Sequence, residues 1–238
     1  EAPNLALPLI EQAIFLLETS RQQLTDFRAE FRHHWSEYYE LWVKTLVENH
    51  RLEEALEAVE KSRARELLDL IQATSLPLSI PEIKSQIGNS TLLEYSLGDH
   101  QSYLFVVNEG RVQVVSLPPR KQIEQSIRSY LDLFDQFAEI PNNLTVTQRQ
   151  TIIDSLNREA ERKSKELAHL LLPVTVKGSL LISPDGPLNY IPFGALLSSQ
   201  VTIVPSISTL AAIRKREYRS TETLAVLADP EAKSKAVT

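Results

Sequence analysis

The spacing of apolar residues divides the chain into a helical N-terminal part and a mixed part that follows it. In the segments 7–24, 27–46 and 52–71, apolar side chains recur every three or four residues, which is typical of helices with one buried face. Only the short polar link 49–51 separates the last two segments. Because a short link places two helices side by side in opposite directions, we expect an antiparallel helical hairpin.

The segment 27–46 carries a stripe of large apolar side chains at helical spacing. Such a stripe packs in a core more often than it lines a peptide-binding groove, and we interpret it as core, with the groove as the alternative. Tyr39 and His34 lie beside the stripe and are the better candidates for exposed contacts. The stripe consists of Phe27, Phe31, Trp35, Tyr38, Trp42 and Leu46.

Short β-rich runs dominate the next part of the chain. Ser79 and Glu82 have the spacing of a capping box, which predicts the start of a short helix. The runs 91–97, 103–107 and 112–117 follow, and tight turns rich in Gly, Asn and Asp separate them. Three short strands with tight turns between them predict an antiparallel meander.

The rest of the chain alternates between helices and short apolar runs. Helical spacing predicts helices over 120–140 and 148–172. The runs 179–183 and 201–204 each end directly before a proline, which is typical of a strand buried on both faces. A last apolar run, 224–228, needs a partner on each edge, so we expect the remainder of the same polypeptide to complete the sheet.

The two buried strands are joined by a connection rich in proline, glycine and aromatic residues. Its first four residues are a strong turn signal, because proline presets φ and glycine tolerates a positive φ. We expect Tyr190, Ile191 and Phe193 to face a buried surface, so that the connection holds the two strands together. The structural motif of this block consists of Pro184, Asp185, Gly186, Pro187, Pro192 and Phe193.

These elements predict an α/β protein of mixed α+β character with two parts. Residues 1–76 form the helical region, and residues 77–238 form an α/β domain that opens with the meander. Pro77 and Pro81 mark the boundary between them, because prolines punctuate a chain between elements.

Composition excludes several classes of function for this chain. A formal net charge of −6 argues against nucleic acid as a partner, since phosphate binding needs a basic surface. There is no apolar run long enough for a transmembrane helix and no signal-peptide pattern, so we expect a cytoplasmic location and no membrane contact. The absence of cysteine excludes disulfides and a cysteine nucleophile within these 238 residues. Methionine is absent even at position 1, which favours a piece of a longer protein.

No residue carries a strong signal of chemistry. Asp185 follows a buried strand, where α/β active sites gather, but a turn aspartate more often caps its own backbone, and we favour that interpretation. Ser183 lacks the Gly-x-Ser-x-Gly elbow of a serine hydrolase and has no histidine after it. His33 and His34 point to different helix faces without a carboxylate at ligand spacing. We therefore expect no catalytic residue, no metal site and no cofactor.

The helical hairpin resembles a tetratricopeptide repeat. The resemblance rests on Tyr39 as the aromatic residue that opens the first helix, on Trp42 behind it, and on Leu52, Ala55 and Val59 of the second helix. It implies the last, capping unit of an array whose repeats bind a protein partner. An ordinary helical hairpin is the alternative.

Three stretches of the chain resemble the CHAT family, the caspase-like domain that accompanies tetratricopeptide repeats. EKSRARELLDLI ends the helical region, and LLEYSLGDHQSYLFVVNEGRVQVVSLP covers the meander. LLISPDGPLNYIPFGALLSSQVTIVPSISTL, followed by TLAVLADP, covers the last block. The likeness extends from about Leu5 to Pro230, and a weaker likeness is to separase.

This resemblance implies the N-terminal part of a caspase-like α/β domain in a bacterial protein of a cysteine peptidase family. In that family a His-Gly and a Cys, which form the catalytic dyad, follow the strand that TLAVLADP resembles. Neither can be carried over to this chain, so the segment is expected to be non-catalytic and to couple the repeats to the peptidase half. One alternative is an interaction scaffold whose parent lacks a working dyad, and another is a chain that pairs with a second subunit.

Overall fold

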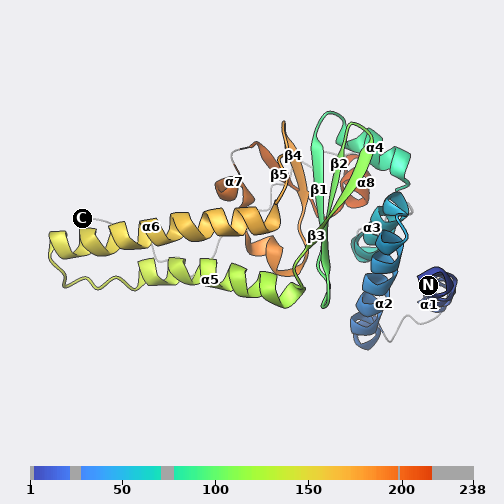
Figure 1. Ribbon diagram of the computed structural model, residues 1–238, viewed down its shortest axis with the longest axis horizontal. Coiled ribbons are helices and arrows are strands. Elements are labelled where there is room, and N and C mark those ends of the chain that lie inside the picture. Colours follow the sequence, from blue (N-terminus) through green and yellow to red (C-terminus); the bar gives the residue numbers. More distant parts are fainter. Residues whose placement is uncertain (1–2, 22–27, 71–77, 198, 216–238) are drawn as a thin grey trace, which may run out of the picture.

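The computed structural model describes residues 3–21, 28–70, 78–197 and 199–215 (Figure 1). Side chains are described over the same ranges except in four places, 3–5, 20–21, 28–35 and 64–70. The predicted strand 224–228 and the boundary residue Pro77 lie outside the described residues.

A mixed five-stranded sheet stands at the centre of the structure (Figure 1). The neighbouring strands follow the order β3-β2-β1-β4-β5. The first three strands along the chain pair antiparallel and form the predicted meander, whereas β4 pairs parallel with both β1 and β5. The strands are β1 (Thr91–Ser96), β2 (Ser102–Asn108), β3 (Arg111–Leu117), β4 (Leu180–Ser183) and β5 (Val201–Ile203).

Helices cover both faces of the sheet, and α1 packs on the outside of α2 (Figure 1). One face carries α2 (Arg28–Glu48), α3 (Leu52–Leu70), α4 (Ile80–Ile87) and α8 (Ile207–Lys215), with α1 (Pro3–Arg21) beyond them. The other face carries α5 (Arg120–Ala138), α6 (Val146–Leu171), the 3-10 helix η1 (Gly186–Tyr190) and α7 (Phe193–Leu196). The hairpin of α5 and α6 extends well beyond the sheet.

The alternation of side chains along the strands explains the two covered faces. In β1, Leu92 points to the face covered by α3, and Leu93 points to the face covered by α5 and α6. In β2, Phe105 points to the α3 face and Leu104 points to the face of α5 and α6. All four side chains are fully buried. Alternate residues of these strands point to opposite faces of the sheet, and the side chains on both faces are apolar. The strands are therefore stable only where helices cover both faces.

The helical hairpin packs directly on the sheet. Ala55 and Leu56 of α3 are fully buried and belong to the same apolar core as Ile83 of α4 and Phe105 of β2. One continuous core therefore crosses the predicted division into residues 1–76 and 77–238, and α3 contacts both parts of the chain.

Several local predictions are confirmed. The capping box of Ser79 and Glu82 is present at the start of α4, with Pro81 in the first turn. The link 49–51 joins α2 to α3, and His50 takes a positive φ of 59° there. β4 is buried along its whole length.

Other predictions are wrong. Tyr190 is 76% exposed, whereas Ile191 and Phe193 beside it are buried. β5 is exposed at Thr202 and Ile203, and among the described residues no strand lies on its outer edge. The connection between β4 and β5 is thus a packed crossing whose tyrosine faces water.

The predicted stripe on α2 is only partly core. Leu46 is fully buried and Trp42 is half-buried, but Tyr38 is 44% exposed, and the described side chains do not include the first three stripe residues. Tyr39, predicted to be exposed, is only 7% exposed. It also lies well inside α2, which begins at Arg28, so it does not open the helix.

Candidate functional site

A cluster of charged and hydroxyl side chains is buried between α3 and the carboxyl ends of β1 and β4. We call it the polar cluster and define it as Glu60 and Arg63 of α3, Glu94 of β1, Ser183 of β4, and Asp185. Glu60, Glu94 and Ser183 are fully buried. The carboxyl ends of parallel strands are the usual place for sites in α/β sheets, so this cluster is the candidate site.

Strand register brings Glu94 and Ser183 together. The two residues are direct partners in the parallel pair of β1 and β4. Leu92 and Leu181, two residues earlier in each strand, both belong to the core on the α3 side, so Glu94 and Ser183 point to that side too. A carboxyl group and a hydroxyl group therefore interrupt an otherwise apolar sheet face directly below α3.

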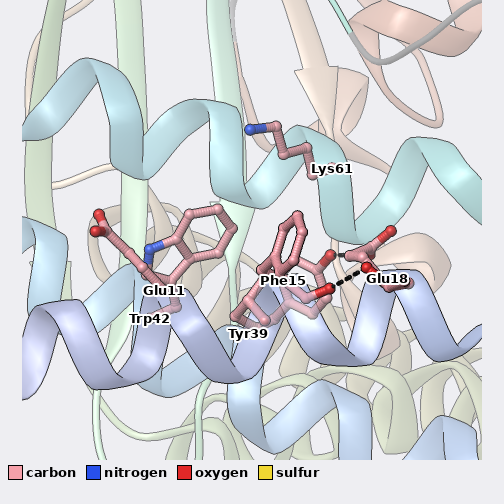
Figure 2. A pocket seen from close by; sticks show the side chains of 8 residues that line it. Glu11, Phe15, Glu18, Tyr39, Trp42 and Lys61 are labelled. Atoms are coloured by element: carbon pink, nitrogen blue, oxygen red, sulfur yellow. Dashed lines mark hydrogen bonds between the residues drawn. The ribbon is translucent and has the colours of Figure 1, made fainter.

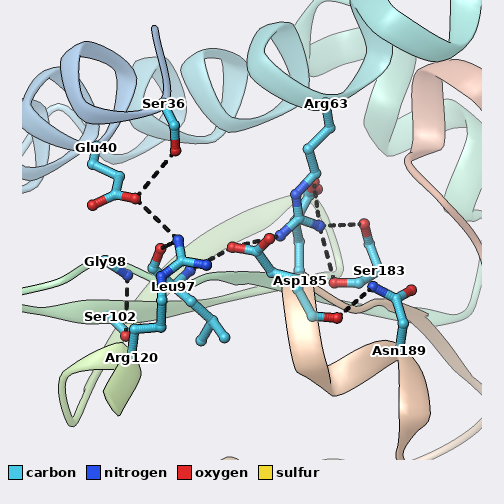
Figure 3. A network of polar contacts seen from close by, with 12 residues as sticks. Ser36, Glu40, Arg63, Leu97, Gly98, Ser102, Arg120, Ser183, Asp185 and Asn189 are labelled. Atoms are coloured by element: carbon cyan, nitrogen blue, oxygen red, sulfur yellow. Dashed lines mark hydrogen bonds and ion pairs between the residues drawn. The ribbon is translucent and has the colours of Figure 1, made fainter. Parts of the chain in front are cut away.

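Arg63 joins the cluster to both strands (Figure 3). Its Nη1 donates hydrogen bonds to the carbonyl oxygen of Ser183 at 3.1 Å and to Ser183 Oγ at 2.7 Å. The guanidinium also lies 3.6 Å from a carboxylate oxygen of Glu94 and 3.6 Å from one of Asp185. The side chain is only 14% exposed, so these contacts are made largely out of water.

Glu60 holds the start of α8. Its two carboxylate oxygens accept hydrogen bonds from the backbone N–H groups of Ile207 at 2.8 Å and Ser208 at 3.0 Å. The first N–H groups of a helix have no partner within the helix, and a negative charge there is favourable. Glu60 thus caps α8 from a distant helix, while Ser206 Oγ accepts the N–H of Thr209.

Asp185 acts as a cross-link and not as the predicted cap of its own backbone. Its Oδ2 accepts the backbone N–H of Leu97 at 2.7 Å, and the same oxygen faces Arg63. No side-chain hydrogen bond from Asp185 caps η1. The turn signal of the sequence was correct, because Gly186 has a positive φ of 49°, but the carboxylate reaches across to the end of β1.

Replacing Asp185 by alanine is expected to lower the free energy of unfolding by about 1–2 kcal/mol, because a charge-assisted hydrogen bond and an ion pair are lost. Urea denaturation measures the change. Asp99→Ala is the matched control, since the Asp99 side chain is 67% exposed and its ion pair with Arg120 is worth about 0.5 kcal/mol or less. Equal losses in the two variants would contradict the cross-link.

A second network continues the polar cluster toward α2 and α5. Arg120 donates to Glu40 Oε1 at 3.0 Å and to the carbonyl oxygen of Leu97 (Figure 3). The backbone N–H of Asp99 donates to Glu40 Oε2 at 3.2 Å. A small cavity of about 80 Å³ lies between this network and the polar cluster. Its size and polar walls suit a few water molecules.

The polar cluster provides charge but no activated nucleophile. Ser183 Oγ donates to the carbonyl oxygen of Pro205 at 3.1 Å and accepts from Arg63. No histidine lines the neighbouring cavity or bonds to this hydroxyl in the described structure, so no base is placed to take its proton. Among the described residues, no group of three or more His, Cys, Asp or Glu side chains could hold a metal ion.

Burial sets the protonation of Glu94. Removal from water raises the pKa of its carboxyl group well above the usual value, and repulsion from Glu60 raises it further, while Arg63 opposes the shift. Glu60 accepts two backbone N–H groups, and Glu94 has no such donors. Burial and the neighbouring charge of Glu60 therefore favour the protonated form of Glu94.

A groove on the helical region is the second candidate (Figure 2). It has a volume of about 420 Å³ and lies between α1, α2 and α3. Phe15 on its wall is 68% exposed, and the Lys61 ammonium lies 5.6 Å from the ring centre of Trp42. Tyr39 donates a hydrogen bond to Glu18 across the groove. This wall suits the apolar side chains of a peptide.

The remaining residues of the predicted motifs are placed as packing and turn residues. Phe193 is buried against Tyr95, with ring centres 5.7 Å apart, whereas Pro192 is exposed. Pro184 is buried, and Pro187 lies in the first turn of η1. In the hairpin, Ala55 and Val59 are buried and Leu52 is half-buried.

The sequence held a signal for the polar cluster that our predictions did not use. Glu94 stands between Leu93 and Tyr95 in a run whose apolar residues predict burial on both faces. An acid at such a position is buried with the strand.

No helix among the described residues has the length and apolarity needed to cross a bilayer. Comparisons of the chain with family models, with curated proteins and with solved structures gave no match.

Proposed function

We propose that this chain is a non-catalytic coupling segment of a CHAT-type, caspase-like protein. In this proposal the helical region binds a protein partner, and α3 passes the effect of binding to the carboxyl edge of the sheet. The peptidase half, with its catalytic dyad, belongs to the remainder of the polypeptide, and the location is cytoplasmic. The outer edge of β5 is where that remainder adds its strand.

One observation supports the proposal: α3 lines the groove on the helical region and also contacts the edge of the sheet. Lys61 of α3 lines the groove, and Arg63, two residues later, bonds to Ser183 at the end of β4. Glu60 caps α8. A shift of α3 caused by a ligand in the groove would therefore move two charged contacts at the place where α/β sites gather.

Replacing Ala55 by leucine tests the coupling. Ala55 is fully buried in the core shared by α3 and the sheet, so a larger side chain is expected to lower the free energy of unfolding by about 2 kcal/mol. Hydrogen exchange of the Ile207 and Ser208 amides should accelerate by more than the global loss of stability explains, because Glu60 moves with α3.

Leu167→Ala is the matched control for this test. Leu167 is buried in the core on the other face, so its truncation destabilises the protein without moving α3. The two amides should then follow only global stability. Faster exchange confined to α2 and α3 in the Ala55→Leu variant, with the two amides unchanged, would reject the coupling.

The coding sequence beyond Thr238 separates the two candidate parents. A His-Gly after one further strand pattern and a Cys after the next would support a latent peptidase. Strands without that pair would support the alternative, a non-catalytic interaction scaffold, which the groove and its exposed Phe15 also suit.

A further inference from the structure

Two buried carboxyl groups lie at the interface between α3 and the sheet. Glu60 and Glu94 are both completely inaccessible to solvent, and the negative charge of Glu60 raises the pKa of the Glu94 carboxyl. Two carboxylates in one dry site cannot both ionise without a large repulsion, so one of them keeps a proton.

The charges around the pair do not balance in the ionised state. From α3, Arg63 faces Glu94, but its hydrogen bonds go to Ser183, and it is equally close to Asp185. From β4, the Ser183 hydroxyl contributes a dipole, and β2 contributes Phe105, the partner of Glu94 in the antiparallel ladder. One guanidinium thus serves two carboxyl groups, those of Glu94 and Asp185.

The hydrogen-bond partners of the two groups are unequal. Glu60 accepts two backbone N–H groups of α8, at 2.8 and 3.0 Å. Neither carboxyl oxygen of Glu94 has a hydrogen-bond donor among the described residues, and its nearest cationic nitrogen is 3.6 Å away. A protonated Glu94 can itself donate, and Glu60 has further lone pairs to accept.

We propose that the buried Glu94 keeps a proton, which it donates to Glu60, and that this proton forms a pH-sensitive contact that holds α3 against the sheet and the start of α8. Loss of the proton leaves two negative charges facing each other in a buried site. α3 then separates from β1, and Glu60 withdraws from the N–H groups of Ile207 and Ser208. The contact regulates the coupling in the proposed function, but the proton of Glu94 stands or falls independently of any partner.

The sign of the pH dependence follows from the direction of the shift. The pKa of the Glu94 carboxyl is raised in the folded protein above its ordinary value of 4.5. The stabilising effect of the proton is therefore complete below that value and is lost as pH rises through the folded pKa. This is the reverse of ordinary acid denaturation, in which the loss of native carboxylate contacts destabilises the protein at low pH.

The first test uses the unmodified chain and reads the proton directly. A protonated carboxylic acid has an infrared carbonyl band separate from that of a carboxylate. We expect this band to persist at pH 7 and to disappear in Glu94→Gln. Its absence from the unmodified chain at pH 7 would overturn the proposal, whatever the variant does.

The second test reads the contact through hydrogen exchange of the Ile207 and Ser208 amides, corrected for the intrinsic effect of pH. In the unmodified chain, protection of these amides should fall by up to about tenfold per pH unit as pH rises from the ordinary pKa of 4.5 toward the raised pKa of the folded protein, since opening releases one proton in that range. In Glu94→Gln, the amide N–H replaces the acid O–H as donor, so protection should be independent of pH.

Glu161→Gln is the matched control for the second test, because Glu161 is exposed on α6 and its neutralisation should leave the pH profile unchanged. Identical profiles in the unmodified chain and Glu94→Gln would overturn the proposal. If those profiles differ as expected while Ala55→Leu leaves the two amides unaffected, the proton of Glu94 is upheld and the coupling alone fails.

Discussion

At pH 7 the Arg63→Met variant is expected to unfold with a free energy about 3 kcal/mol below that of the unmodified chain. Methionine fills most of the space of the arginine stem but donates no hydrogen bond. The carbonyl and hydroxyl of Ser183 then lose a donor, and Glu94 and Asp185 lose the cation between them. Removing one partner from a buried charge cluster costs more than the pair contributes, because the other charges remain buried.

Urea denaturation measures this loss, and Arg162→Met is its control. Arg162 makes ion pairs with Glu159 and Glu166 on the exposed side of α6, where its side chain is 55% exposed. The same chemical change there is expected to cost less than about 1 kcal/mol. Similar losses in the two variants would show that burial adds nothing to the contacts of Arg63.

Combining Arg63→Met with Asp185→Ala separates the shared contact from the individual ones. The two side chains face each other, so their losses should not add, and the double variant should lose less than the sum. Additive losses would indicate that Arg63 acts through Ser183 and Glu94 alone.

Local sequence patterns predicted most of the fold because their physical causes are local. The Glu82 carboxylate accepts hydrogen bonds from the backbone N–H and the hydroxyl of Ser79, three residues earlier, so their spacing alone specifies the start of α4. The turns of the meander depend on residues such as Gly110, which takes a positive φ of 75°. Neither feature requires knowledge of what packs against it.

The polar cluster could not be predicted in this way because tertiary packing decides it. Glu60 and Arg63 stand in the charged stretch EKSRARE, which on an isolated helix is typical of a solvated face. Only the placement of α3 over Glu94 and Ser183 buries them. The prediction that Tyr190 is buried was wrong for the opposite reason. Its aromatic ring comes soon after buried Leu188 in the sequence, but it projects from η1 into water.

Exposure of β5 and burial of Tyr39 illustrate the same dependence. The apolar pattern of 201–204 predicts burial on both faces, yet Ile203 is 51% exposed, and no described strand pairs with the outer edge of β5. Tyr39 lies beside the predicted stripe, yet α1 covers it and Glu18 accepts a hydrogen bond from its hydroxyl. Whether an apolar segment is buried depends on the element that packs against it, and that element can lie far away in the sequence.

Replacing Gly98 by alanine is the other change expected to have a large effect. An added Cβ would lie 2.5 Å from the carbonyl oxygen of Gln101 and 3.3 Å from Glu40 Oε2. The first of these is a backbone atom in the tight turn between β1 and β2, so the turn itself must move. We expect a loss of about 3 kcal/mol, at the upper end of the cost of overpacking.

The position of Gly98 makes this loss more than local. Its N–H donates to Ser102 Oγ at 3.2 Å, and its carbonyl oxygen accepts the backbone N–H of Arg120 at 2.9 Å. Moving the turn therefore displaces the start of α5 and the contact of Arg120 with Glu40. Hydrogen exchange at Asp99, whose amide donates to Glu40, should accelerate together with the global loss.

Gly194→Ala is the control that separates steric clash from a general intolerance of alanine. A Cβ at Gly194 would meet nothing within 4 Å, and the residue lies in α7, where alanine is the better helix former. Its replacement is expected to be neutral or to stabilise the protein by up to about 1 kcal/mol. If Gly98→Ala is as well tolerated as Gly194→Ala, the added Cβ does not clash with the carbonyl oxygen of Gln101. That result would also contradict the role of Gly98 in joining α2 and α5 to the sheet.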